Sequence, residues 1–197
     1  MNAGAGRLLI VLAVGVVLAW TALDFERREN DLPAAATDDN APDTYMVNAR
    51  IKQFGADGRL RHVINAARFT HYPKTDVTTL VEPEIDLRDV GDTPWRITSK
   101  SGRILPAPSA DAGETIELSG DVLATRTSNA DVSIATESLF VHPDDNYVET
   151  DQPVVIEDPR GRTTAAGMQA WLAPGRYVLH GQAPRRVVSM LTPADGS

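Results

Sequence analysis

Histidine and acidic side chains are the residues of this 197-residue chain whose types could carry out chemistry. Together, imidazole and carboxylate groups can bind zinc or transfer protons. The four histidines are His62, His71, His142 and His180, and none forms a His-x-x-x-His or His-x-His pair with another. A zinc site would therefore need ligands from distant parts of the chain, so we expect these histidines to be ordinary strand or surface residues.

The segment Asp144-Asp145-Asn146 could hold a calcium ion. It lacks the spaced oxygen ligands and the glycine of a calcium loop, and it follows His142-Pro143, so a hairpin turn is the better interpretation. Carboxylates are frequent among the 27 acidic residues, but no pair is marked out as the acid and nucleophile of a glycosidase. The chain also has no Gly-x-Ser-x-Gly elbow and no phosphate-binding glycine loop. We expect no enzyme activity, no cofactor and no bound metal.

The composition excludes further classes of protein. The chain has no cysteine, so it contains no disulfide, thiolate metal site or cysteine nucleophile. Its formal net charge of −8 argues against nucleic-acid binding, which requires clustered basic residues. The charge is uneven, because five arginines and one aspartate follow position 159, a net of +4, while residues 31–159 carry a net of −12. A chance distribution of surface charge is the alternative interpretation.

The amino-terminal part predicts a membrane anchor. Residues 8–23 read LLIVLAVGVVLAWTAL and are uncharged. With Arg7 and Phe25 at the two interfaces, this stretch can span a bilayer as one helix. We therefore expect a short segment at 1–7, a transmembrane anchor at 8–25 and a linker at 26–44. A cleaved signal peptide is the alternative, although Trp20 and Ala22 fit a cleavage site poorly.

The rest of the chain predicts an all-β domain at 45–191, followed by a tail at 192–197. Valine, isoleucine and threonine dominate this part, and these β-branched residues favour strands. About fourteen short alternating runs are separated by turn residues, which is typical of an antiparallel sandwich or roll. A weak repeat of roughly 30 residues, starting at Ile116, Tyr147 and Tyr177, indicates stacked strand pairs with open edges at both ends.

Several short motifs, in this order and spacing, resemble the LptC family over essentially the whole chain. They are Tyr45, Phe54-x-x-Asp57-Gly58-x-Leu60, His71-Tyr72, Pro83, Pro94-Trp95, Gly120-Asp121-Val122 and Gly167-Met168. The resemblance implies an antiparallel β-jellyroll of two facing sheets. It also implies that this domain lies in the periplasm of a Gram-negative cell, attached by a single-pass helix to the inner membrane.

The same resemblance implies a role in lipopolysaccharide transport from the inner to the outer membrane. The domain would accept the lipid from the LptB/LptF/LptG ATPase transporter and pass it to LptA. The LptF jellyroll would add to the N-terminal edge strand and LptA to the C-terminal one, through main-chain hydrogen bonds. The edge residues implied are Tyr45, Val47 and Ile51 at one end and Arg186, Val187 and Val188 at the other. A homodimer is left open.

The alternating apolar positions are candidates for a lipid-binding face. They are Val47, Ala49, Ile51, Leu80, Ile85, Leu87, Trp95, Ile97, Leu118 and Val178. The alternative is that these side chains form an ordinary closed core. A closed core would favour another function, that of a membrane-tethered periplasmic scaffold for envelope assembly that does not bind lipid.

Overall fold

The computed structural model describes residues 40–88, 94–109, 113–126, 132–183 and 186–191. The chain divides into two units, Met1–Ala41 and Pro42–Ser197, and every described strand belongs to the second. The predicted anchor at 8–25, most of the linker at 26–44 and the tail at 192–197 lie outside the described residues. Within the described ranges, no helix is long and apolar enough to span a membrane.

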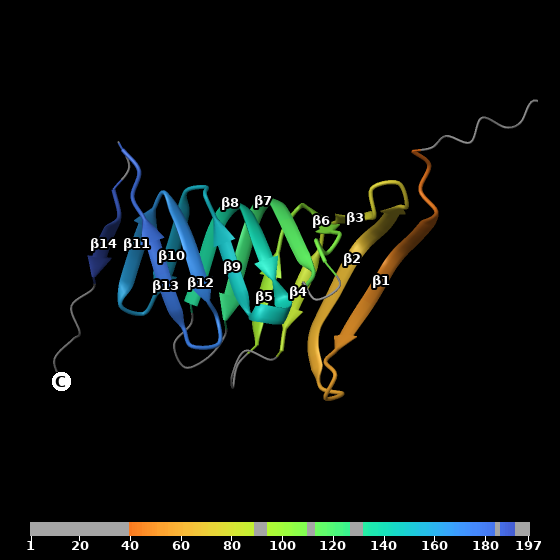
Figure 1. Ribbon diagram of the computed structural model, residues 1–197. Coiled ribbons are helices and arrows are strands. Elements are labelled where there is room, and N and C mark those ends of the chain that lie inside the picture. The colour runs from red at the N-terminus through yellow and green to blue at the C-terminus, as the bar shows by residue number, and fades with distance from the viewer. Residues whose placement is uncertain (1–39, 89–93, 110–112, 127–131, 184–185, 192–197) are drawn as a thin grey trace, which may run out of the picture. The chain divides into compact units, whose positions relative to one another are not determined.

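Fourteen antiparallel strands and one short 3-10 helix make up the described part of the second unit (Figure 1). The strands are β1 (Thr44–Phe54), β2 (Leu60–Tyr72), β3 (Val77–Val81), β4 (Glu84–Leu87), β5 (Trp95–Thr98), β6 (Ser101–Leu105), β7 (Thr115–Arg126), β8 (Val132–His142), β9 (Tyr147–Thr150), β10 (Val154–Asp158), β11 (Gly161–Ala165), β12 (Gly167–Trp171), β13 (Arg176–His180) and β14 (Val188–Leu191). The helix η1 (Pro143–Asp145) forms the turn between β8 and β9. This confirms the predicted all-β class.

The strands form one continuous hydrogen-bonded sheet that folds into two facing layers, which is consistent with the predicted jellyroll. Layer A runs β1-β2-β3-β6-β7-β8-β9-β12-β13, and layer B runs β1-β2-β4-β5-β7-β8-β10-β11-β14. The four long strands β1, β2, β7 and β8 belong to both layers. For example, β8 pairs with β10 through residues 133–136 and with β9 through residues 140–142. Each long strand bends where it passes from one layer to the other.

All of these bends lie along one side of the folded sheet, which we call the spine. Left-handed backbone occurs at three places along it, with φ values of 49° at Asn48 in β1, 50° at Glu82 between β3 and β4, and 49° at Asp121 in β7. Main-chain hydrogen bonds join neighbouring bends, from Glu82 N to Lys100 O and from Lys100 N to Gly120 O, both at 2.9 Å. The chain passes between the layers at residues 48, 66–67, 82–83, 99–100, 120–121, 137, 151–153 and 166. Backbone therefore joins layer A to layer B along the spine.

On the opposite side, which we call the mouth, the described hairpin turns each stay within one layer. Layer B turns there between β1 and β2 and between β10 and β11, while layer A turns between β8 and β9 and between β12 and β13. Among the described residues, no strand pairing and no main-chain hydrogen bond crosses the mouth from one layer to the other. Contacts that the structure describes across the mouth are between side chains, such as Arg61 with Asp144.

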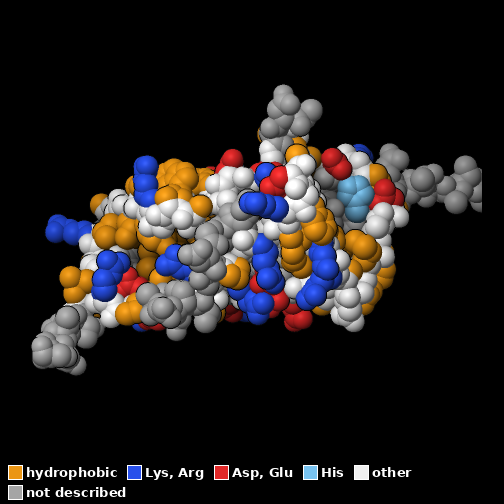
Figure 2. All heavy atoms as spheres, turned by 90° about the horizontal axis from the view of Figure 1, so that it is seen from below, with side chains coloured by type: hydrophobic (Ala, Val, Ile, Leu, Met, Phe, Trp, Pro, Cys, Tyr) orange, Lys and Arg blue, Asp and Glu red, His pale blue; other side chains and the backbone are white. Residues whose placement is uncertain are grey.

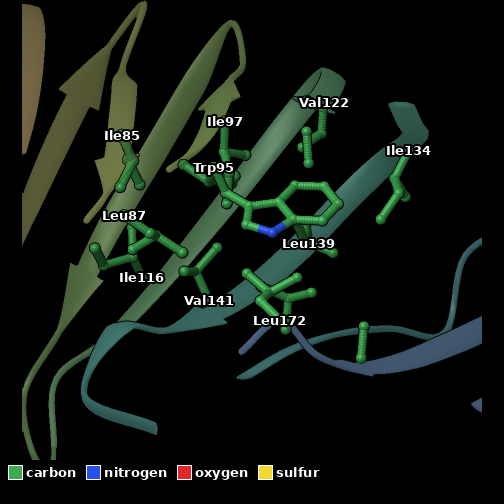
Figure 3. Packing of buried hydrophobic residues seen from close by; sticks show 14 of the residues in the cluster. Ile85, Leu87, Trp95, Ile97, Ile116, Val122, Ile134, Leu139, Val141 and Leu172 are labelled. Atoms are coloured by element: carbon green, nitrogen blue, oxygen red, sulfur yellow. The ribbon is translucent and has the colours of Figure 1, made fainter. Parts of the chain in front are cut away.

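Apolar side chains of both layers meet between them in one cluster. Layer A supplies Phe69 and Leu139, and layer B supplies Trp95 and Ile97. Figure 3 shows the Trp95 ring among Ile97, Val122 and Leu139, and the indole side chain is 0% exposed. A fully buried side chain of this kind contributes about 1.5–3 kcal/mol or more to folding, so this cluster is a major source of stability in a chain without disulfides.

Candidate functional site

The interior between the layers brings together most of the apolar residues singled out in the sequence. Six of them are buried members of the core cluster: Leu80 and Leu118 in layer A, and Ile85, Leu87, Trp95 and Ile97 in layer B. Ala49 and Ile51 are half-buried and pack against this cluster from β1, at the N-terminal end of the unit. The interior is therefore closely packed at its centre and partly exposed at this end.

Two of the predicted interior residues do not lie in the interior. Val47 is 55% exposed, because β1 reverses its faces at the left-handed Asn48, so that Met46 before the bend and Ala49 after it both point inward. Val178 is half-buried and lies outside the core cluster, while its neighbours Tyr177 and Leu179 pack against the cluster. The strict alternation that we assumed in β1 is wrong at this bend, and in β13 we assigned the wrong set of alternate positions.

The N-terminal end of the unit is an open edge. Among the described residues β1 pairs only with β2. Tyr45, Val47 and Phe54 are exposed along it, and the Arg68 guanidinium lies over the Tyr45 ring, 5.5 Å from its centroid. A strand with one free side and exposed apolar residues is suited to pairing with another sheet.

The C-terminal end has two open edges, one for each layer. Within the described ranges, layer B ends on β14, which pairs only with β11, and layer A ends on β13, which pairs only with β12. Met190 and Leu191 in β14 are 70% and 74% exposed. The strand predicted at 186–190 begins at Val188 in the structure, so Arg186 and Val187 precede it, and the edge formed by β13 was missed.

Figure 2 shows how these ends appear from below. Hydrophobic side chains reach the surface toward both ends of this face, and several Lys and Arg side chains lie between them. The exposed large apolar residues of the described part are consistent with this, since most belong to β1, β14 or the residue before β14. Patches of this kind mark interaction surfaces when they coincide with open strand edges.

Polar side chains bridge the mouth near its centre. Arg61 Nη1 from layer B lies 3.2 Å from Asp144 Oδ1 in η1 of layer A. Beside this ion pair, His62 Nε2 lies 3.9 Å from Glu114 Oε2. Burial lowers the pKa of His62, whose side chain is only 3% exposed, and burial together with the charge of Asp144 raises the pKa of Glu114. Both shifts favour the neutral forms of the two groups.

The mouth also holds buried polar atoms that have no hydrogen-bond partner. They are Arg61 Nε, His62 Nδ1, Trp95 Nε1, Arg126 Nε, His142 Nε2 and Tyr177 Oη. Every one of these six residues stands at the mouth end of its strand, and none stands at the spine. Sequence reasoning missed this group, because only the pairing of distant strands brings its members to one side of the fold.

The outer face of layer A carries an aromatic ladder beside the mouth. The rings of His142 and Tyr147 lie 5.5 Å apart, those of Tyr147 and Trp171 lie 5.1 Å apart, and the Arg176 guanidinium lies 4.4 Å from the Trp171 ring. Burial and a hydrogen bond from its hydroxyl to Glu149, 2.6 Å long, raise the pKa of Tyr147 to about 12. This ladder faces away from the interior, so it is a separate surface.

The basic residues near the C-terminus are mostly engaged within their own layer. Arg160 Nη2 lies 2.8 Å from Asp158 Oδ2, and Arg162 Nη1 lies 2.9 Å from Glu157 Oε1. Arg176 stacks on Trp171 and has no carboxylate partner among the described residues, so it keeps its positive charge while Arg160 and Arg162 are ion-paired.

The chemistry-bearing residues considered first are dispersed. His71 lies beside Thr78, while His180 is exposed at the end of β13. Across the described ranges, no group of three or more His, Asp and Glu side chains could hold a metal ion. The segment at Asp144 forms the predicted turn, with Asn146 in left-handed conformation at its end.

Comparison with protein families identifies the family to which the chain belongs. Residues 8–184 match the model of one family, described as lipopolysaccharide-assembly, LptC-related. The chain belongs to this LptC-related family. Comparison with curated protein sequences gave no match. LptC proteins take part in lipopolysaccharide transport and are associated with the cell envelope, so the two-layer interior and the open edges become the candidate sites for lipid and partners.

Proposed function

We propose that this LptC protein carries lipopolysaccharide between the two layers of its sheet. It receives the lipid from the LptB/LptF/LptG transporter and passes it to LptA, without catalysing a reaction. The N-terminal segment anchors it in the inner membrane, and the domain lies in the periplasm. ATP hydrolysis by the transporter supplies the energy.

Physical chemistry requires such a carrier. A lipid with about six acyl chains has on the order of 60 methylene groups, and exposing each to water costs about 0.8 kcal/mol, or roughly 50 kcal/mol in all. The chains therefore need an apolar path across an aqueous compartment, while the sugars remain hydrated. A folded sheet whose layers are joined by backbone at the spine, with no strand pairing across the mouth among the described residues, offers such a path.

The observation that carries the proposal is the continuity of the apolar interior from one open edge to the other. The core cluster includes side chains from Ile64 in β2 to Ala165 in β11, with Ile51 against it at the N-terminal end and Tyr177 and Leu179 at the C-terminal end. Strand addition at β1 by LptF, and at β13 or β14 by LptA, would extend this interior into those of its neighbours.

Photo-crosslinking of the full chain tests the proposal. A crosslinker at Leu80 points into the interior, while one at the adjacent Thr79 lies on the outer face of the same strand and is the matched control. A second probe at Ala49 reports on the N-terminal end. We expect lipopolysaccharide adducts at Leu80 and Ala49 that require ATP and the transporter, and few or none at Thr79.

The alternative function is that of a periplasmic scaffold with a permanently closed core. The complete burial of Trp95 favours this alternative, because the interior must part before it can admit a chain. No lipid adducts at Leu80 and Ala49, in complexes that still contain the transporter and LptA, would establish the scaffold and overturn the carrier.

A further inference from the structure

Three polar side chains at the C-terminal half of the mouth have unused hydrogen-bond donors. Trp95 and Arg126 are register partners at the mouth ends of β5 and β7 in layer B, and Tyr177 stands near the start of β13 in layer A. Trp95 Nε1, Arg126 Nε and Tyr177 Oη are all buried without a hydrogen-bond partner. Both layers therefore contribute unpaired donors.

Arg126 is related to each of the other two side chains. The Arg126 guanidinium lies over the Trp95 ring, 5.5 Å from its centroid. Its positive charge also acts on Tyr177, where it opposes the increase in pKa that burial causes. Arg126 therefore contacts the indole in layer B, and its charge reaches the phenol in layer A.

Arg126 lacks the carboxylate partner that many arginines of the described part have. Arg96 is paired with Asp86, and Arg162 is paired with Glu157. For Arg126, by contrast, the described residues provide no ion pair and no hydrogen bond. The carboxylate of Asp158, which influences Tyr177, is already held by the Arg160 side chain and main-chain N–H.

A cation with neighbouring N–H and O–H donors fits a ligand that has several acceptor oxygens and negative charge. Buried donors are rarely left unpaired in folded proteins, so a group of them is a signal for an absent acceptor. Phosphate meets this need better than a neutral hydroxyl, since its oxygens accept charge-assisted hydrogen bonds from arginine. A sugar hydroxyl would satisfy the donors but would leave the guanidinium charge uncompensated.

We infer that Arg126, Tyr177 and Trp95 form a site for a phosphate monoester at the mouth. The inference rests on the proposed function in one respect: the phosphate belongs to the lipid whose acyl chains occupy the interior. The site spans both layers, so a phosphate bound there would hold the headgroup at the mouth while the chains lie inside. Inorganic phosphate has the same chemistry and is the other source to be distinguished.

Binding measurements on the full chain in detergent test this site. The lipid probe is lipopolysaccharide with its phosphates intact, compared with the same preparation after treatment with phosphatase. The variants are Arg126→Gln, Arg126→Lys and Tyr177→Phe. The matched control is Arg103→Gln, which removes an arginine that is paired with Glu117 on the outer face of layer A. Thermal unfolding of each variant establishes that the fold is retained.

We expect Arg126→Gln to weaken binding of the phosphorylated lipid by roughly 10-fold and Tyr177→Phe by roughly 3-fold, with Arg126→Lys in between. Binding of the dephosphorylated lipid should be the same for all variants, and Arg103→Gln should change neither affinity. Equal losses on both lipids, or no loss on either, would overturn the site.

A separate measurement uses inorganic phosphate alone and detects its binding by the broadening of its phosphorus NMR resonance. Broadening that disappears in Arg126→Gln would support the site with free phosphate as a ligand in its own right. Broadening that is unchanged in this variant would place phosphate elsewhere and count against the site. If the wild-type chain binds neither lipid preparation, the carrier function fails, and this measurement still decides whether the anion site exists.

Discussion

Arg61 in layer B and Asp144 in layer A form an ion pair that spans the mouth, with Nη1 3.2 Å from Oδ1. The chain has no cysteine, so Arg61→Cys with Asp144→Cys creates the only pair of thiols. We expect a short bis-maleimide linker between them to hold the layers together and to abolish lipopolysaccharide adducts at Leu80. Gel mobility measures the linkage, and photo-crosslinking measures the lipid.

The control for this experiment is a linked pair within one layer. Arg103 and Glu117 form an ion pair between β6 and β7 of layer A, so a linker between cysteines at these positions does not cross the mouth. Lipid adducts should persist in this variant. Persistence of adducts in the linked variant at Arg61 and Asp144 would show that the mouth does not need to open.

Acidification should destabilise the domain through His62. Its folded-state pKa lies below the ordinary value of 6.5, so below that pH the unfolded chain binds a proton that the folded chain does not. The free energy of unfolding therefore falls as the pH drops from about 6.5 toward the lowered folded-state pKa. His62→Gln should lose less stability between pH 7.5 and pH 5.5 than the wild type, as measured by urea denaturation.

Glu114 makes the opposite contribution to the pH dependence of the unfolding free energy, at lower pH. Its pKa is raised above the ordinary value of 4.5 in the folded state, so the folded chain binds the extra proton as the pH falls toward 4.5. Glu114→Gln removes this compensation, and its unfolding free energy should fall more steeply with acid than that of the wild type. A shallower decline would mean that the carboxylate is not buried as the structure has it.

The C-terminal edge should depend on Gly161. Its φ of 146° suits glycine, and a Cβ there would collide with the carbonyl oxygen of Met190 in β14. Gly161→Ala should separate β14 from β11, increase hydrogen exchange at 188–191 and reduce LptA binding several-fold. Gly175→Ala is the control, because Gly175 also has positive φ but faces open space.

Exposed apolar side chains on β14 should matter for LptA more than similar side chains elsewhere. Met190→Asp places a charge on this open edge and should weaken pull-down of LptA at least several-fold. Val81→Asp is the comparison, since Val81 is also exposed but β3 is paired on both sides, with β2 and β6. Equal effects of the two changes would argue against the edge as the LptA site.

The two tryptophans of the described part should differ in their contribution to stability. Trp95→Ala empties a fully buried position and should cost about 3–5 kcal/mol. Trp171→Ala removes a stacked, half-exposed ring on the outer face and should cost roughly 1 kcal/mol. Urea denaturation of both variants measures the difference, and equal costs would contradict the assignment of the interior.

The sequence predicted the strands well because β-branched residues and turn residues report local preferences directly. It predicted the bends poorly. A bend such as that at Asn48 reverses the inward-facing positions without interrupting the strand, so Val47 was assigned to the wrong face. The mouth residues were beyond sequence reasoning, since His62 and Glu114 meet only after strands of the two layers have paired with their neighbours.

The spine determines how the two layers can move apart. Since the backbone connections between layers lie on that side, the layers can part at the mouth by rotating about it while the ladders of main-chain hydrogen bonds stay intact. The work of opening is then done against side-chain contacts, and it grows with the length of mouth that is parted. On the proposed function, a long amphiphile would advance by separating one strand pair at a time while the contacts behind it close again, so that the domain opens locally without unfolding.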